Sequence, residues 1–173
     1  VSLEFHASTS DGGWEVQWEG AIAGARPAGS WALHSGWSGR IRGNSDELLR
    51  GNTSFRNIVL LDEGRPTTFE RLDIMGNWDG REAQVRWESD LGTGQVNAAT
   101  DESAWRNWLH ALEQREPAAS TPPFAAEIMV RRFAPIALLT GHPIRVADGS
   151  RITASSRPDG FAIAVESEEV AYS

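Results

Sequence analysis

Three common features are missing from this chain: cysteine, lysine and a long apolar run. Without cysteine no disulfide can hold the fold together, which is compatible with any compartment. The longest apolar stretches, Ile58 to Leu61 and Ala134 to Leu139, fall far short of the roughly 18–20 residues that a membrane helix needs. We therefore expect no transmembrane segment in this chain.

The absence of lysine means that arginine supplies all of the side-chain positive charge. All 16 basic residues are Arg, the formal net charge is −8 and the pI is about 5.0. Binding to a nucleic-acid backbone needs clustered cations, yet only Arg131 and Arg132 are adjacent, and on a strand they would point to opposite faces. The charge argues against a nucleic-acid partner, and we interpret the arginine-only composition as typical of a GC-rich bacterial genome.

Asp-Gly dipeptides mark the turns of the predicted fold. Between two alternating segments this dipeptide is the strongest short-range hairpin signal, because both residues tolerate the positive φ of a tight turn. It occurs at Asp11-Gly12, Asp79-Gly80 and Asp159-Gly160, each time leading into an alternating strand that ends in Glu. Residues 21–52, in contrast, are rich in Gly and Ser, and only 31–33 and 39–42 have a strand-like pattern.

One amphipathic helix is predicted over about 101–115. Thr100 can cap it, and four apolar residues recur on one face: Trp105, Trp108, Leu109 and Leu112. Residues 117–123 form a loop rich in Pro, Ala, Ser and Thr. The sequence thus predicts that residues 1–173 form a single, mainly β domain. Its antiparallel hairpin or meander sheet is curved or sandwich-like, and the helix packs on it.

The strand after Asp159-Gly160 differs from the other two because it is apolar on both sides. Ala162 and Ala164 stand where the first strand carries Glu15 and Gln17. A strand without polar alternation is covered on both sides or by something outside the chain, and a central strand of a sandwich is the favoured interpretation.

Tryptophan on strands is the other candidate for function. Aromatic residues of this kind are core residues or contacts for a ligand or partner. The candidate contact residues are Trp14, Trp18, Trp87, Phe161 and Ile163.

Motifs for catalysis or cofactor binding are weak. Gly36-Trp37-Ser38-Gly39-Arg40 resembles the nucleophile turn of serine hydrolases, but Arg40 replaces its second Gly and no convincing helix follows. Gly92-Thr93-Gly94 is better explained by a hairpin turn than by a dinucleotide loop. The four histidines lack metal-ligand spacing. The sequence therefore predicts no catalytic residue, cofactor or metal site.

Two segments resemble AsmA-like, TamB-related proteins of the Gram-negative envelope. They are TFERLDIMGNWDGREAQVRWESDLGTGQV and PPFAAEIMVRRFAPIALLTGHPIRVADGSRITASSRPDGFAIAVES, in which short strands close with Asp-Gly hairpins. The N component of type II secretion systems is similar in its Gly-punctuated strands. Members of the AsmA-like group are usually long and membrane-anchored, so this chain would be a mature protein or a fragment without its signal or anchor.

The resemblance implies a non-enzymatic periplasmic or envelope-associated protein. Its curved sheet would bind lipid acyl chains or envelope proteins through an apolar face, in lipid transport or secretion-system assembly. The alternative from another class is a carbohydrate-binding module or carbohydrate-active enzyme that uses the strand tryptophans.

Overall fold

The computed structural model describes most of the chain in a single β-rich arrangement. The described residues are 2–10, 12–25, 31–44, 48–62, 65–99, 103, 106–107, 110, 122–132, 144–157 and 160–172.

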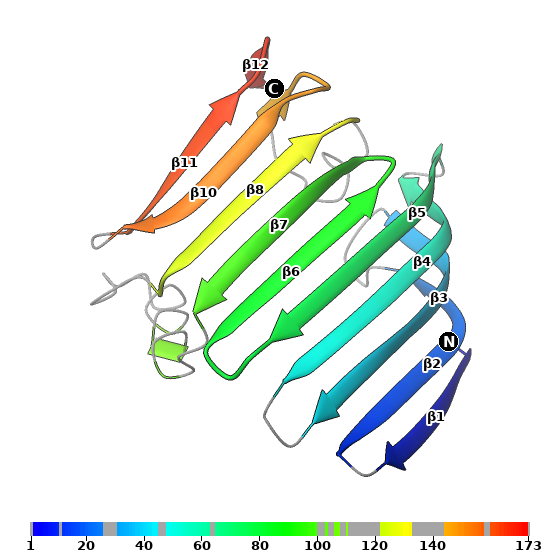
Figure 1. The fold of residues 1–173 in the computed structure, drawn as a ribbon. Helices are drawn as coiled ribbons and strands as arrows, with labels where there is room; N and C mark the ends of the chain where they lie inside the picture. The colour runs from blue at the N-terminus through cyan, green and yellow to red at the C-terminus, as the bar shows by residue number, and fades with distance from the viewer. Residues whose placement is uncertain are drawn as a thin grey trace.

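Among the described residues, twelve strands make up two antiparallel sheets, and Figure 1 shows the larger one. Ten of them form one sheet in the order β1-β2-β3-β4-β5-β6-β7-β8-β10-β11, while β9 and β12 form a separate two-stranded sheet. The large sheet is built from β1 (Ser2–Ser10), β2 (Gly13–Ala25), β3 (Trp31–Asn44), β4 (Leu49–Asp62), β5 (Arg65–Trp78), β6 (Glu82–Ser89), β7 (Gly92–Ala99), β8 (Phe124–Val130), β10 (Arg151–Arg157) and β11 (Gly160–Glu166). The small sheet consists of β9 (Ile144–Val146) and β12 (Val170–Tyr172).

The predicted Asp-Gly hairpins are confirmed. The strands on either side of each dipeptide are antiparallel neighbours: β1 with β2, β5 with β6, and β10 with β11. The glycines Gly12, Gly80 and Gly160 have φ values of 131°, 85° and 151°, a region in which side chains are rarely tolerated. Asp79 also accepts hydrogen bonds from the backbone N–H groups of Arg81 and Glu82 at 3.0 and 2.8 Å. Asp11 and Asp159 lie outside the described residues.

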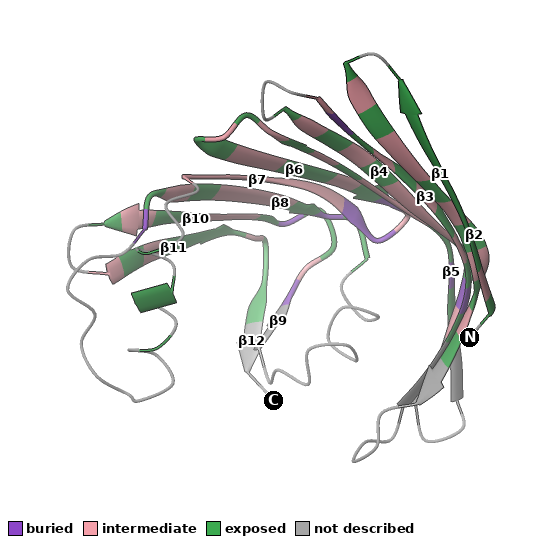
Figure 2. Cartoon of the chain, turned by 90° about the horizontal axis from the view of Figure 1, so that it is seen from below, coloured by how far each residue is buried: buried purple, intermediate pink, exposed green. Residues whose placement is uncertain are grey.

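The large sheet is a single curved layer, so the curved alternative is confirmed and the sandwich alternative is wrong. Figure 2 shows the strands of the large sheet forming a curved layer, with the small β9–β12 sheet on its concave side. β1 and β11 are the two edges and do not pair with each other. Only the two short strands of the small sheet stand apart from the layer, so among the described residues no second sheet packs over its length.

The predicted helix over 101–115 is not supported. Among the described residues of this segment, Ser103, Arg106, Asn107 and His110 have helical backbone and are exposed, but no helix can be delimited. The four residues that the sequence places on its buried face all lie outside the described residues: Trp105, Trp108, Leu109 and Leu112.

Buried apolar side chains gather in a small cluster where the long strands bend. Ile58, Phe69 and Leu91 are 2%, 6% and 7% exposed, and the partly buried Phe55 and Leu72 pack against them.

The register of β3 against β4 shifts between His34 and Gly36, opposite Asn57, which has a φ of 52°. A residue with positive φ at an extra position is typical of a bulge, which bends the strand.

Candidate binding site on the apolar face

The pairing register divides the large sheet into two chemically different faces. Side chains alternate along each strand, and residues directly opposite each other share a face. Following the register from β1 to β11 places nearly all large apolar side chains of the regular strands on one side, which we call the apolar face. Its larger members are Phe5, Trp14, Val16, Trp18, Trp37, Ile41, Leu49, Phe55, Leu72, Ile74, Trp78, Val85, Trp87, Val96, Ile128, Ile152, Phe161, Ile163 and Val165.

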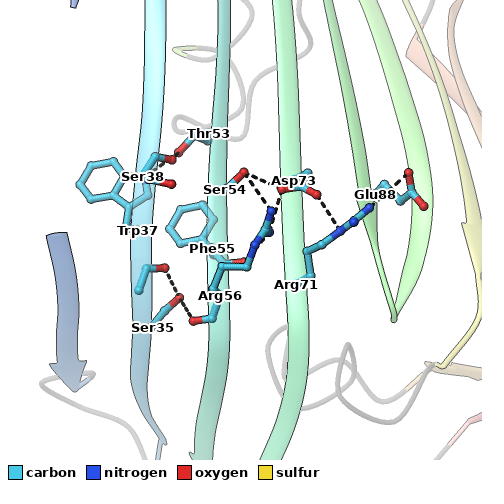
Figure 3. Close-up of polar contacts among 11 residues, drawn as sticks. Ser35, Trp37, Ser38, Thr53, Ser54, Phe55, Arg56, Arg71, Asp73 and Glu88 are labelled. Atoms are coloured by element: carbon cyan, nitrogen blue, oxygen red, sulfur yellow. Dashed lines mark hydrogen bonds and ion pairs between the residues drawn. The ribbon is translucent and has the colours of Figure 1, made fainter. Parts of the chain in front are cut away.

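The opposite, polar face carries the charged and amide side chains. A ladder of ion pairs crosses β4, β5 and β6 on this face (Figure 3). Asp73 is at its centre, 2.8 Å from the guanidinium of Arg56 and 2.7 Å from that of Arg71, and it accepts a hydrogen bond from the Ser54 hydroxyl at 2.5 Å. Arg71 reaches Glu88 at 3.7 Å.

Asp73 is held in its charged form by this ladder. Partial burial raises the pKa of its carboxyl, but the Ser54 hydrogen bond and the Arg56 and Arg71 guanidinium groups outweigh that effect. The net result is a pKa below the ordinary value of Asp. The polar face thus carries an ordered network of charged side chains, whereas the other face carries apolar groups.

On the apolar face, tryptophan rings lie across glycines of the adjacent strand. Trp14 covers Gly43, Trp18 covers Gly39, and Trp87 covers its direct partner Gly94; a Cβ added at any of these glycines would overlap the ring. Trp18 also contacts Trp37, with ring centroids 5.9 Å apart, and Trp37 stacks on Phe55 at 6.0 Å. The rings therefore lie close against the backbone of the sheet and form a broad aromatic surface.

A depression of about 310 Å³ opens on the apolar face over β2 to β6. Ile41, Gly51, Gly76 and Val85 follow one another across four strands in a single row, and the two glycines leave its middle without side chains. Large apolar side chains border this gap in the neighbouring rows: Trp18, Leu49, Ile74 and Trp78. The volume lies at the lower end of the range for ligand pockets. We call this depression the glycine hollow.

The floor of the glycine hollow is open around Gly76. A Cβ at Gly76 would meet only the carbonyl oxygen of Gln84, at 3.8 Å. A Cβ at Gly51 would approach the Arg40 carbonyl oxygen at 3.2 Å and the Ile41 side chain at 3.5 Å. The hollow therefore exists because residue 76 is glycine, although the space around it would accept a larger side chain.

The five contact candidates from the sequence all lie on the apolar face, at different distances from the glycine hollow. Trp18 borders it, while Trp87 lies across Gly94 and Trp14 is 40% exposed on β2. Phe161 and Ile163 are 54% and 60% exposed on the edge strand β11. Whether any of them contacts a ligand remains a prediction.

Several residues around the hollow were not singled out from the sequence, namely Ile41, Leu49, Ile74, Trp78 and the two glycines. The alternation of Leu72, Ile74 and Trp78 in the predicted strand 69–78 is a signal that could have identified two of them. The glycines could not have been identified, because their role depends on the register between strands.

The strand with apolar residues on both sides is not central. β11 pairs with β10 alone and forms an edge of the sheet, so its interpretation as a central sandwich strand is wrong. Ala162 is half-buried and Ala164 is exposed on the polar face.

Neither a metal-binding cluster nor a membrane-spanning helix is present in the part of the chain that the structure describes. There, no cluster of three or more His, Asp and Glu residues could hold a metal ion. Likewise, the described residues contain no helix with the length and hydropathy to cross a membrane. No protein-family model, curated protein or solved structure matches this chain.

Proposed function

We propose that this protein is a non-enzymatic acyl-chain-binding protein, and that the chains lie on the apolar face with the glycine hollow as the central contact. The observation that carries the proposal is the row Ile41, Gly51, Gly76 and Val85, which leaves an open apolar depression between bordering aromatic and aliphatic side chains. A function in lipid transport or secretion-system assembly at the bacterial envelope agrees with the resemblance to AsmA-like proteins.

Energetics support acyl chains as the occupant. Each methylene group moved from water onto an apolar wall is stabilised by about 0.8 kcal/mol. The wall is available because Val85 and Trp14 are 38% and 40% exposed and Trp18 and Trp78 are half-buried. A contiguous apolar surface that lacks charged groups marks a site for a lipid or a protein partner. An envelope protein that inserts an apolar segment into the same hollow is therefore the alternative binding partner. A test must distinguish binding of a lipid from binding of such a protein.

The carbohydrate alternative is less well supported by the distribution of polar groups. A sugar site needs hydrogen-bonding side chains beside its stacking surface. Here the carboxylates Glu15, Asp73 and Glu88 belong to the polar face, on the opposite side of the sheet from Trp18 and Trp87. Among the described side chains that border the hollow, none is charged.

Gly76→Val is the test of the acyl-binding proposal, because it places a branched side chain in the middle of the hollow without disturbing the backbone. Gly76 is not among the glycines with positive φ, and valine favours strands. Gly36→Val is the matched control: Gly36 lies on the polar face, and its added Cβ would meet the Arg56 carbonyl oxygen only at 3.8 Å. Both variants should fold, which circular dichroism and thermal melting would check.

Binding would be measured by native mass spectrometry of protein purified from bacteria, followed by titration with palmitic acid and with an oligosaccharide. We expect co-purifying lipid and palmitate binding in the wild type and in Gly36→Val, and at least tenfold weaker palmitate binding in Gly76→Val. Wild-type protein that binds no lipid, or Gly76→Val that binds palmitate as the wild type does, would overturn the proposal. Tryptophan fluorescence that shifts with the oligosaccharide alone would favour the carbohydrate class.

A further inference from the structure

The edge strand β11 has no partner among the described strands along its outer side. β11 pairs with β10 from Gly160 to Glu166, and no other described strand lies against it. Figure 1 shows β11 at the margin of the sheet. Free N–H and C=O groups at such an edge are a template for pairing with another strand.

The side chains of β11 lack the usual protection of an exposed edge. Phe161, Ile163 and Val165 are 54%, 60% and 42% exposed on the apolar face, and Ala162 and Ala164 occupy the other face. The only charged residue of the strand is its last, Glu166. Natural proteins place charges, prolines or bulges in exposed edge strands to prevent pairing. The opposite edge follows this rule, since β1 contains Glu4 and His6 within the strand.

The sequence of β11 is self-complementary in an antiparallel arrangement. When two copies pair around Ile163, Phe161 lies opposite Val165 of the second copy and Ala162 lies opposite Ala164 of the second copy. Glu166 then lies opposite Gly160 of the second copy, so no like charges face each other. Apolar side chains meet apolar side chains on one face, and alanines meet alanines on the other. Direct apolar cross-strand pairs of this kind stabilise sheets.

We propose that β11 is a homodimer interface, in which two copies of this chain pair antiparallel through β11 about a two-fold axis at Ile163. An axis perpendicular to the sheet keeps both apolar faces on the same side, and this joins them into one continuous surface. Both copies then satisfy the free backbone groups of the edge. The inference is independent of what the apolar face binds.

The second copy pairs better through β11 than through β1. Aligning β11 with β1 so that Phe161 faces Ala7 would set Glu4 against Ala164 and His6 against Ala162. Such a head-to-tail contact would leave an unused β1 edge at one end of the assembly and an unused β11 edge at the other, and assembly would continue without limit. The β11–β11 contact closes at two copies. Stable complexes bury roughly 1,200 Å² of surface or more. The β11–β11 contact involves seven residues per copy, which is a small interface, so the dimer should be weak and concentration-dependent.

Two double variants test both the interface and its register. Ala162→Lys with Ala164→Lys places two pairs of like charges directly opposite each other across the dimer. Ala162→Lys with Ala164→Glu changes the same positions but places Lys opposite Glu twice. Sedimentation equilibrium over a wide concentration range would measure the dissociation constant of each, with circular dichroism and thermal melting as the check on folding.

We expect a monomer–dimer equilibrium for the wild type and dimerisation at least about tenfold weaker for the Lys/Lys variant, because directly opposed like charges are destabilising. The Lys/Glu variant should dimerise at least as well as the wild type. A wild type that stays monomeric at every concentration would overturn the proposal, as would equal dimerisation of the two double variants. Species larger than a dimer in the wild type would instead indicate pairing of β11 with β1.

Discussion

The indole ring of Trp87 lies on Gly94, its direct partner on the neighbouring strand β7, so closely that even a methyl group at Gly94 would overlap the ring. The same arrangement joins Trp18 to Gly39 and Trp14 to Gly43. Glycine usually weakens a strand, but an aromatic ring from the adjacent strand can cover the exposed backbone and compensate. These pairs explain how a single layer rich in glycine can be a stable sheet.

Gly94→Ala should therefore destabilise the protein, although alanine is normally favoured over glycine in regular structure. The added Cβ would displace the Trp87 ring, and overpacking of this kind costs about 1–3 kcal/mol. Urea denaturation would measure the loss. Gly76→Ala is the control, because open space surrounds its Cβ and a gain of about 0.4–1 kcal/mol is expected. Equal effects of the two substitutions would show that the ring does not rest on Gly94.

Asn57 should tolerate glycine but not a β-branched residue. Its φ of 52° lies in the left-handed region, which asparagine and glycine enter more readily than other residues. Asn57→Val should lower the free energy of unfolding by about 1–2 kcal/mol, while Asn57→Gly should stay close to the wild type. Asn52 is exposed on the same strand, so the control Asn52→Val should change the free energy of unfolding by less than about 0.5 kcal/mol. A tolerated Asn57→Val would contradict the bulge at this position.

Acid should weaken the fold through Asp73. Its folded-state pKa lies below the ordinary value, so its contribution is fully present above the unfolded pKa of about 3.9 and is lost as the pH falls through the folded pKa. We expect Asp73→Asn and Arg56→Gln to show a smaller loss of urea stability than the wild type between about pH 5 and pH 2.5. An unchanged slope in both variants would mean that the ladder makes no contribution to acid sensitivity.

Ile58 should be among the most sensitive apolar positions. It is 2% exposed and packs with Phe69 and Leu91 in the buried cluster, so Ile58→Ala should cost about 2–5 kcal/mol. Ile163→Ala makes the same chemical change at a site that is 60% exposed and should cost less than about 1 kcal/mol at protein concentrations too low for dimerisation. Thermal denaturation of the two variants side by side would test this contrast.

Hairpins were the part of the fold that could be predicted, because an Asp-Gly turn and its flanking alternation are local signals. Strand length was harder to predict. Residues 31–33 and 39–42 were recognised as separate strand-like pieces, yet β3 runs without interruption from Trp31 to Asn44. Its Gly and Ser residues have little strand preference of their own, but β2 and β4 pair with them along both sides. Neighbouring strands thus override local propensity.

The layer architecture and the glycine hollow could not be derived from alternation alone. Alternation shows which side of a strand is apolar, but it does not show what covers that side. The apolar strand β11 therefore resembled a buried central strand, although it is an edge. The hollow depends on Gly51 and Gly76 becoming direct neighbours, and that requires the register between β4 and β5.

From β2 to β7 each strand pairs with the strands that precede and follow it in the chain. Interactions in such an array are those of nearest neighbours, as in repeat proteins. Duplication or loss of one hairpin in a gene would add or remove two strands and leave the direction and sidedness of all the others unchanged. The length of the apolar face is therefore a quantity that evolution can adjust in steps of one hairpin, without redesigning the remaining sheet.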